Sequence, residues 1–222
     1  MDVLEEDQGV ELSGLRRVIR KVLGSAADPA VRWYRHWWID LDDFARTVSR
    51  LGSVERVLEI GCGDGHLTER LAIEMPKCAI VGIDIGADPG SLYRGDPGSV
   101  SFQVILAGEL ADSEPQSFGL VVLCDVLHHI PLDQRAAVLH DAGRLVAPGG
   151  HLIVKDWVWG WNPASVTCWL SDRVISGDKI HYFPSRDEFV RSLTEACPKT
   201  SVVAEGRVPP RRNNIYAALR FD

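Results

Sequence analysis

The chain has 222 residues, enough for one α/β domain with a full hydrophobic core and few for two. Its 45% apolar and 25% charged residues are typical of an ordinary globular protein. The 24 basic and 31 acidic residues give a net charge of −7, which disfavours a nucleic-acid partner because such a protein needs a basic face. No apolar run is long enough to span a membrane, so no membrane partner is expected.

The ends and the cysteines predict a cytoplasmic protein. The acidic N-terminus, Met1-Asp-Val-Leu-Glu-Glu-Asp7, lacks the basic-then-apolar order of a signal peptide. The 5 cysteines are scattered singly, without metal-ligand or redox spacing, so no metal site is expected. Free thiols are typical of a reducing compartment.

Two helices are predicted before the first strand. Apolar residues recur at helical intervals over residues 14–51, and Asp28-Pro29 marks the break between the helices. We interpret residues 1–51 as a helical N-terminal cap.

The stretch Val57-Leu-Glu-Ile-Gly-Cys-Gly-Asp-Gly65 is the most informative segment of the chain. A short apolar strand delivers Glu59 and then breaks into three glycines at alternate positions. Glycine is needed where the backbone passes close to a ligand or takes a positive φ. The helix that follows, about residues 66–75, opens its N-terminus toward whatever this loop holds.

The second strand, residues 79–84, ends in the carboxylate of Asp84. An acid about 20 residues after a glycine turn is placed to hydrogen-bond both ribose hydroxyls of an adenosine. A dinucleotide-binding loop spaces its glycines Gly-x-Gly-x-x-Gly, and here the third glycine comes one position early. This spacing disfavours an NAD-binding protein.

Further strands and helices alternate along the chain, which predicts parallel strand pairing with right-handed crossovers. The final two strands are expected to form a hairpin across the Pro209-Pro210 turn, after a helix capped by Ser185. The expected strands are residues 56–60, 79–84, 100–106, 120–123, 151–155, 201–205 and 214–220, and the later helices are residues 132–146 and 186–196.

The chain resembles the class I S-adenosylmethionine-dependent methyltransferases over about residues 54–156. Their first motif reads acid-x-Gly-x-Gly-x-Gly, matched by Glu59, Gly61, Gly63 and Gly65. The resemblance implies an α/β, Rossmann-like methyltransferase fold: a seven-stranded, mostly parallel sheet with an antiparallel final strand. It also implies one methyltransferase domain over residues 1–222, with a cofactor-binding core at 52–156 and a lid segment and closing strands at 157–222.

S-adenosyl-L-methionine is the cofactor that the resemblance implies. The glycine loop would carry its methionine portion, Glu59 its amino group and Asp84 its ribose. Many relatives have an Asp after the third strand, where this chain has Ile-Leu-Ala-Gly-Glu109, so either Glu109 substitutes or backbone alone holds the adenine. The expected cofactor-binding residues are Glu59, Gly61, Cys62, Gly63, Gly65, Asp84, Ile85, Ala107, Gly108, Glu109 and Cys124.

Three histidines and one carboxylate are candidate catalytic residues. Histidine is a suitable general base near neutral pH. His128 and His129 follow the fourth strand and face about 100° apart on a helix, so at most one points into the site. His181 lies in the segment that covers the acceptor in similar enzymes, and Asp156 ends the fifth strand. Packing roles are the alternative for each.

All 7 tryptophans lie outside the expected cofactor-binding core. Two groups flank that core, and in this fold both regions cover the acceptor site. Indole walls suit an aromatic or apolar substrate, whereas the alternative is that the rings only pack the lid on the sheet. The expected substrate-binding residues are Trp33, Trp37, Trp38, Trp157, Trp159 and Trp161.

The predicted function is methyl transfer from S-adenosylmethionine to an oxygen, nitrogen or carbon of a small-molecule acceptor, with secondary metabolism as one setting. Two alternatives stay open. One is a protein that binds the cofactor for non-methylating chemistry, such as cyclisation or decarboxylation. The other is a protein or RNA methyltransferase. A homodimer is one assembly that the sequence allows.

Overall fold

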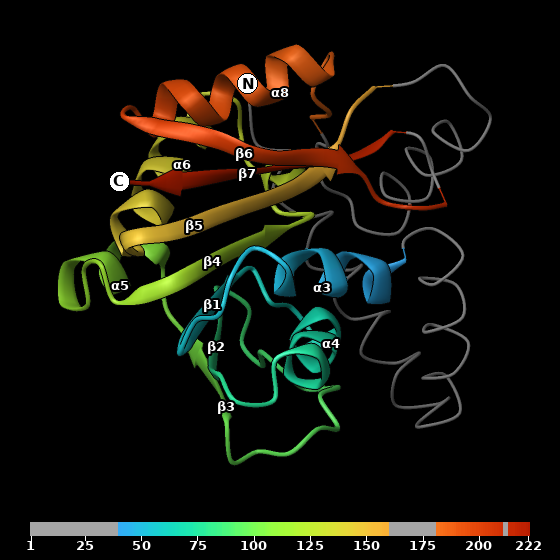
Figure 1. The fold of residues 1–222 in the computed structure, drawn as a ribbon, viewed down its shortest axis with the longest axis vertical. Helices are drawn as coiled ribbons and strands as arrows, with labels where there is room; N and C mark the ends of the chain where they lie inside the picture. Colours follow the sequence, from blue (N-terminus) through green and yellow to red (C-terminus); the bar gives the residue numbers. More distant parts are fainter. Residues whose placement is uncertain (1–39, 160–180, 211–212) are drawn as a thin grey trace, which may run out of the picture.

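The computed structural model describes residues 40–159, 181–210 and 213–222. Its centre is a seven-stranded sheet with the strand order β3-β2-β1-β4-β5-β7-β6 (Figure 1). The strands are β1 (Arg56–Ile60), β2 (Ala79–Asp84), β3 (Val100–Val104), β4 (Phe118–Cys124), β5 (Val146–Trp157), β6 (Thr200–Arg207) and β7 (Asn214–Phe221).

Strands β1 to β5 pair in parallel, and β7 inserts antiparallel between β5 and β6. The expected mostly parallel sheet with an antiparallel final strand is therefore confirmed. The ends of β1, β2, β4 and β5 lie at one edge, because Ile60 pairs with both Ile83 and Leu123, and Cys124 pairs with Lys155. Ligands of open α/β sheets bind outside this carboxyl edge.

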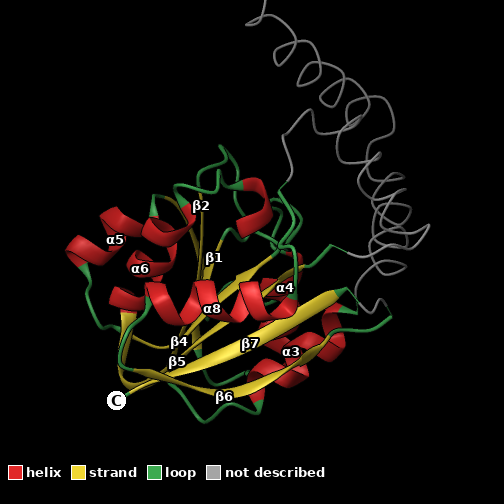
Figure 2. Ribbon diagram, turned by 90° about the horizontal axis from the view of Figure 1, so that it is seen from above, coloured by secondary structure: helices red, strands yellow, loops and turns green. Residues whose placement is uncertain are grey.

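Helices cover both faces of the sheet (Figures 1 and 2). One face carries α3 (Leu41–Ser49) and α4 (His66–Glu74), and the other carries α5 (Ala107–Ser113), α6 (Arg135–Leu145) and α8 (Arg186–Ala196). Strand β4 contributes to the hydrophobic core on each face of the sheet. Leu120 and Val122 pack on the face with α3 and α4, and Val121 and Leu123 pack on the face with α5, α6 and α8. This period of two, with both faces buried, explains why the strand is a continuous apolar run.

Capping fixes the ends of two helices. The Ser185 hydroxyl accepts a hydrogen bond from the Glu188 N–H, as the sequence predicts, and starts α8. The Asp40 carboxylate accepts from the Asp43 N–H at 2.8 Å and starts α3. The Asp40 N–H donates to the Pro209 carbonyl at 2.8 Å, which ties α3 to the turn between β6 and β7.

Element boundaries differ from the expectation in the middle of the chain. Strand β3 ends at Val104 rather than at residue 106, because Leu106 becomes the first residue of the turn into α5, a helix that the sequence analysis did not predict. Strand β4 begins at Phe118 and β5 at Val146, so both are longer than expected. The helix before β5 begins at Arg135 instead of residue 132 and ends one residue early, at Leu145.

Of the expected N-terminal cap, only α3 falls within the described residues, and its buried side chains are Phe44, Ala45 and Val48. The division of the chain into cap, core and lid stays a prediction. Within the described ranges, no helix combines the length and the apolar character that crossing a membrane requires.

Candidate cofactor and catalytic site

The glycine loop after β1 has the backbone that its sequence predicts. Gly61, Gly63 and Gly65 have φ values of +75°, +50° and +85°. A Cβ on Gly61 would lie 2.4 Å from Cγ2 of Val126, so the close packing of Val126 on the backbone leaves no room for a side chain at this position. A Cβ on Gly63 would meet nothing within 4 Å, which means that the exposed tip of the loop faces open space.

The loop folds back on the end of β2. The N–H groups of Gly61 and Cys62 donate to the Ile83 carbonyl at 2.8 and 3.0 Å, and the Gly65 N–H donates to the Cys62 carbonyl. Cys62 is buried, and burial raises the pKa of its thiol above the usual range. The Cys62 thiol therefore stays protonated and packs beneath the loop.

Asp84 is held at the end of β2 by two backbone amides. One oxygen of its carboxylate accepts from the Gly63 N–H and the other from the Gly86 N–H, each at 2.8 Å. A carboxylate oxygen can accept a second hydrogen bond, so both remain capable of binding a hydroxyl. Ile85, the next residue, is 75% exposed.

Glu59 is a buried acid directly beneath the loop. Only 2% of its surface is exposed, and its carboxyl accepts a hydrogen bond from the Thr68 hydroxyl at 2.5 Å. Burial raises the pKa of Glu59 to about 8, and the Thr68 hydrogen bond offsets part of the shift. A nearby cation would stabilise the ionised form, so the site suits an ammonium group.

The segment after β3 forms the first turn of α5, beside Asp84. The Ile105 N–H donates to the Asp84 carbonyl at 3.3 Å, which places this segment at the same edge as the ribose candidate. The carboxylate of exposed Glu109 accepts from the Leu106 N–H at 3.2 Å and caps the helix. Ala107 and Gly108 are half-buried, and Gly108 packs against Asp141 of α6.

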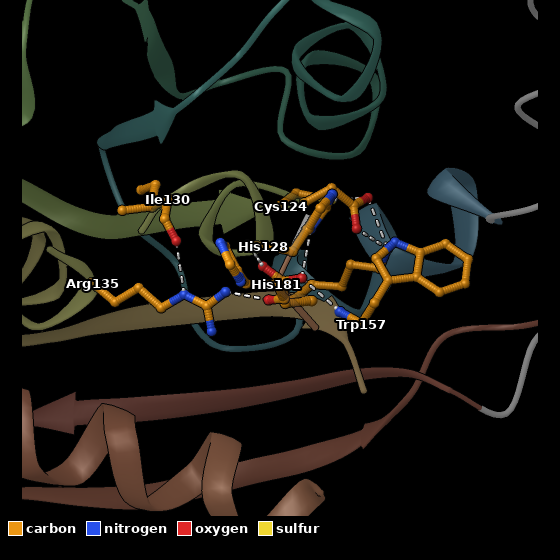
Figure 3. Close-up of polar contacts among 9 residues, drawn as sticks. Cys124, His128, Ile130, Arg135, Trp157 and His181 are labelled. Carbon is orange, nitrogen blue, oxygen red and sulfur yellow. Dashed lines mark hydrogen bonds and ion pairs between the residues drawn. The ribbon is translucent and has the colours of Figure 1, made fainter. Parts of the chain in front are cut away.

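A buried histidine–aspartate pair joins the ends of β4 and β5 (Figure 3). Nδ1 of His128 lies 2.7 Å from the Asp156 carboxylate, which also accepts from the His128 and Trp157 N–H groups at 3.2 and 2.6 Å. Burial lowers the pKa of His128, but the Asp156 carboxylate more than offsets this, so the net shift is upward. The same contact, against burial, holds the pKa of Asp156 below its usual value.

A second ion pair lies beside the first. Nζ of fully buried Lys155 lies 2.6 and 2.8 Å from the two oxygens of Asp125 and 5.0 Å from the ring centroid of Trp157. Asp125 has a φ of +59° and donates its N–H to the Lys155 carbonyl. The sequence analysis missed both residues, although a lysine inside the apolar strand Leu152-Ile-Val-Lys-Asp156 is the pattern that could have indicated a buried charge.

Cys124 ends β4 at this edge, as expected. The residue is half-buried, and its thiol lies 3.5 Å from the Asp125 carboxylate. Burial raises the pKa of this thiol well above its usual value, so Cys124 is not a nucleophile.

The structure also brings His181 to His128. The His181 N–H donates to the His128 carbonyl at 2.9 Å, and the Arg135 guanidinium donates to the His181 carbonyl (Figure 3). His129 is exposed, and its ring centroid lies 4.1 Å from that of His128. Of the two adjacent histidines, His128 is therefore the buried one that contacts Asp156.

Aromatic side chains adjoin the pair on β5 and the following segment. Trp157 is buried, Trp159 is 45% exposed, and the Tyr182 ring lies 6.3 Å from Trp159 and 6.0 Å from His128. Tyr182 was not among the expected substrate-binding residues. Four that were, Trp33, Trp37, Trp38 and Trp161, lie outside the described residues.

Asp125, His128 and Asp156 each offer a ligand atom, and these atoms lie within 4.8 Å of one another. Their charges already have partners, since Lys155 contacts both oxygens of Asp125 and His128 contacts Asp156. A cation would have to displace the Lys155 ammonium. The arrangement thus favours a proton-transfer role over metal binding.

A mostly parallel sheet with a glycine loop after β1 and a fixed carboxylate at the end of β2 is typical of nucleoside-binding α/β proteins. Residues 58–152 match the model of a methyltransferase domain family. This stretch thus has the sequence pattern of a methyltransferase domain, on the fold of the S-adenosylmethionine-dependent methyltransferases.

Known relatives agree with this assignment. The ubiquinone biosynthesis O-methyltransferase of Pseudomonas syringae pv. tomato is 33% identical over 102 residues, which are 44% of this chain and 42% of that protein. The match thus spans less than half the length of that relative.

Two solved structures share the fold. The N-methyltransferase NodS from Bradyrhizobium japonicum WM9, in complex with S-adenosyl-L-homocysteine, has a TM-score of 0.60 at 21% identity, covering 85% of this chain and 91% of that one. The 1,6-didemethyltoxoflavin-N1-methyltransferase of Burkholderia thailandensis has a TM-score of 0.63 at 18% identity, covering 95% and 90%.

Proposed function

We propose that the protein transfers the methyl group of S-adenosylmethionine to a hydroxyl oxygen of a small-molecule acceptor. The observation that carries the proposal is the buried His128–Asp156 pair, at the sheet edge where Glu59 and Asp84 also lie. A hydroxyl loses its proton on methylation, and a histidine oriented by a carboxylate removes a proton near neutral pH. The name of the Pseudomonas relative, an O-methyltransferase, supports oxygen as the acceptor atom.

The residues at the edge fit the cofactor at three points. The open space at Gly63 leaves room for a methionine chain against the loop. The buried Glu59 carboxyl suits the cofactor's amino group, since an ammonium would stabilise its ionised form. The fixed Asp84 oxygens suit the two ribose hydroxyls.

When bound, S-adenosylmethionine supplies a methyl group that its sulfonium has already activated. The protein's own work is to orient the acceptor and to remove its proton. Asp156 engages Nδ1 of His128, which leaves Nε2 to accept that proton. Asp156 then stabilises the imidazolium, as a carboxylate does in other histidine–acid pairs.

Neighbouring residues support an aromatic or apolar acceptor. Trp159 and Tyr182 lie next to each other, and Tyr182 adjoins His128, so flat apolar surface borders the proposed base. His181 and Arg135 hold this segment against the turn after β4 and the start of α6, through the His128 and His181 carbonyls. Their proposed role is to position Tyr182, while His181 remains the second candidate for the base.

The test is methyl transfer from S-adenosylmethionine to a panel of phenols and catechols, with products identified by mass spectrometry. His128→Gln should lower kcat by about 10²–10⁴-fold, because the general base is lost, while the Kd for S-adenosylhomocysteine holds. The matched control is His129→Gln, the exposed neighbour, which should keep the wild-type rate.

Two results would contradict the proposal. One is a His128→Gln variant with the wild-type rate, which would move the base to His181 if His181→Gln is then the slow variant. The other is that every active acceptor is methylated on nitrogen or carbon and none on oxygen.

A further inference from the structure

An open pocket of about 410 Å³ lies on the face of the sheet that α3 covers, and its lining includes both His151 and Tyr216, the cross-strand partner of Lys155. Its walls come from the end of α3, the middle of β5 and the strands β6 and β7. Along β5, His151 in this pocket precedes Asp156 by five residues, about 16 Å of extended chain. The lining residues are Thr47, Arg50, Leu51, His151, Val203, Ala204, Tyr216 and Arg220.

The pocket gathers positive charge in a protein whose net charge is −7. Arg50, Arg220 and His151 line it, and no acidic side chain does. His151 and Arg220 are direct cross-strand partners on β5 and β7. Burial and then the Arg220 charge lower the pKa of His151, so near neutral pH the two arginines carry the positive charge and His151 offers a neutral imidazole.

The donors of the pocket are also unused within the part of the chain that the structure describes. There, neither the Arg50 nor the Arg220 guanidinium has an ion pair or hydrogen bond, although most other arginines do. The Tyr216 hydroxyl, above Gly206 of β6, likewise makes no hydrogen bond to a described residue. Two guanidinium forks, an imidazole and a phenol therefore surround one space.

We propose that this pocket binds a phosphorylated small molecule, at a site separate from the methyl-transfer centre. Two arginines, a histidine and a tyrosine supply more donors than the two oxygens of a carboxylate can accept, and a phosphate monoester offers three. Leu51, Val203 and Ala204 give the pocket an apolar side, which suits a hydrocarbon or aromatic ring beside the phosphate. The volume is in the range of small-ligand sites. The proposal does not depend on the proposed function.

The experiment is calorimetric titration of the full chain with phenyl phosphate, inorganic phosphate and benzoate at constant ionic strength. Phenyl phosphate should bind saturably and more tightly than the other two. Arg50→Gln and Arg220→Gln should each weaken it about tenfold or more, because each removes a charge-assisted contact. The matched control is Arg207→Gln, which removes an exposed arginine of β6 that does not line the pocket.

Saturable binding of phenyl phosphate by the wild type and Arg207→Gln, with weaker binding by both pocket variants, supports the site. Absence of saturable binding, equal affinity in all four proteins, or benzoate binding as tightly as phenyl phosphate would overturn it. The Kd for S-adenosylhomocysteine should be the same in all four proteins, so failure here leaves the methyltransferase proposal untouched.

Discussion

If Glu59 binds the cofactor's amino group as proposed, cofactor affinity should depend on pH. Its pKa of about 8 in the folded protein exceeds the ordinary value of 4.5, so the folded chain holds a proton there that the unfolded chain releases. The stability of the cofactor-free protein therefore falls as pH rises from 4.5 to about 8. Binding of an ammonium group favours ionised Glu59, so cofactor affinity changes in the opposite direction and rises over this range.

The corresponding prediction concerns Glu59→Gln. In the wild type, the Kd for S-adenosylhomocysteine should fall by about tenfold per pH unit from about pH 6 to 8, because binding must first remove the Glu59 proton. In the variant the slope should vanish. Calorimetry across that pH range checks this, and parallel slopes in the two proteins would show that Glu59 does not titrate on binding.

Lys155 directly precedes Asp156, the partner of the proposed base His128. Its positive charge lowers the pKa of His128, whereas Asp125 raises it. Lys155→Met leaves the Asp125 charge without its partner, so the pKa of His128 should rise. Because the base acts when neutral, the acidic limb of the pH–rate profile should move to higher pH.

The control for this shift is the double variant Asp125→Asn with Lys155→Met, which removes both charges and should return the limb close to the wild-type position. It also guards against unfolding, since one buried charge left alone costs about 3–5 kcal/mol and loss of the pair costs less. If the acidic limb of the pH–rate profile does not move in Lys155→Met, a group other than His128 governs that limb.

At the level of elements, strands β1 and β2 and helix α8 were predicted with their observed boundaries. Each carries a clear local pattern: an apolar run with an acid at or next to its last residue, or a Ser185 cap followed by Glu188. Helix α5 was missed because its seven residues are too few to establish an apolar period, and its cap is the Glu109 side chain returning to Leu106. The early start of β5, across Pro148 and two glycines, depends on pairing of Val146 with Phe118, which is not local in sequence.

Two glycines of the loop should differ in their roles, one in the stability of the fold and the other in cofactor binding. Gly61→Ala would place a Cβ against Val126 at a φ of +75°, so it should lower stability by about 1–3 kcal/mol. At Gly63 an added Cβ meets no protein atom within 4 Å, so Gly63→Val should change stability mainly through the strain of its positive φ. Its side chain would fill the space proposed for the methionine chain, so cofactor binding should be lost. Thermal unfolding and calorimetry of both variants provide the check.

Adding Val126→Ala to Gly61→Ala should restore part of the lost stability, because the shorter side chain relieves the contact but not the φ. If Gly63→Val unfolds the protein as much as Gly61→Ala does, the open space at Gly63 is not a ligand site.

For the whole molecule, the sequence predicted the sheet and its closing antiparallel strand. The strands that carry Glu59, Asp84 and Asp156 end at one edge of this sheet. The sequence could not choose among His128, His129 and His181, because the choice depends on which ring reaches Asp156 across two strands. The sequence analysis missed the Asp125–Lys155 pair because the two residues are 30 positions apart and meet only in the folded sheet. The meeting of two tryptophan groups over the site stays a prediction.

The central claim is that the carboxyl edge binds S-adenosylmethionine through the Asp84 carboxylate. Calorimetry with S-adenosylhomocysteine tests it directly on the wild type, Asp84→Ala and the exposed neighbour Asp88→Ala, each verified as folded by circular dichroism. Loss of the ribose hydrogen bonds should weaken binding by about 2–4 kcal/mol in Asp84→Ala, while Asp88→Ala binds as the wild type does. Equal affinity in all three proteins would place the cofactor elsewhere and contradict the account.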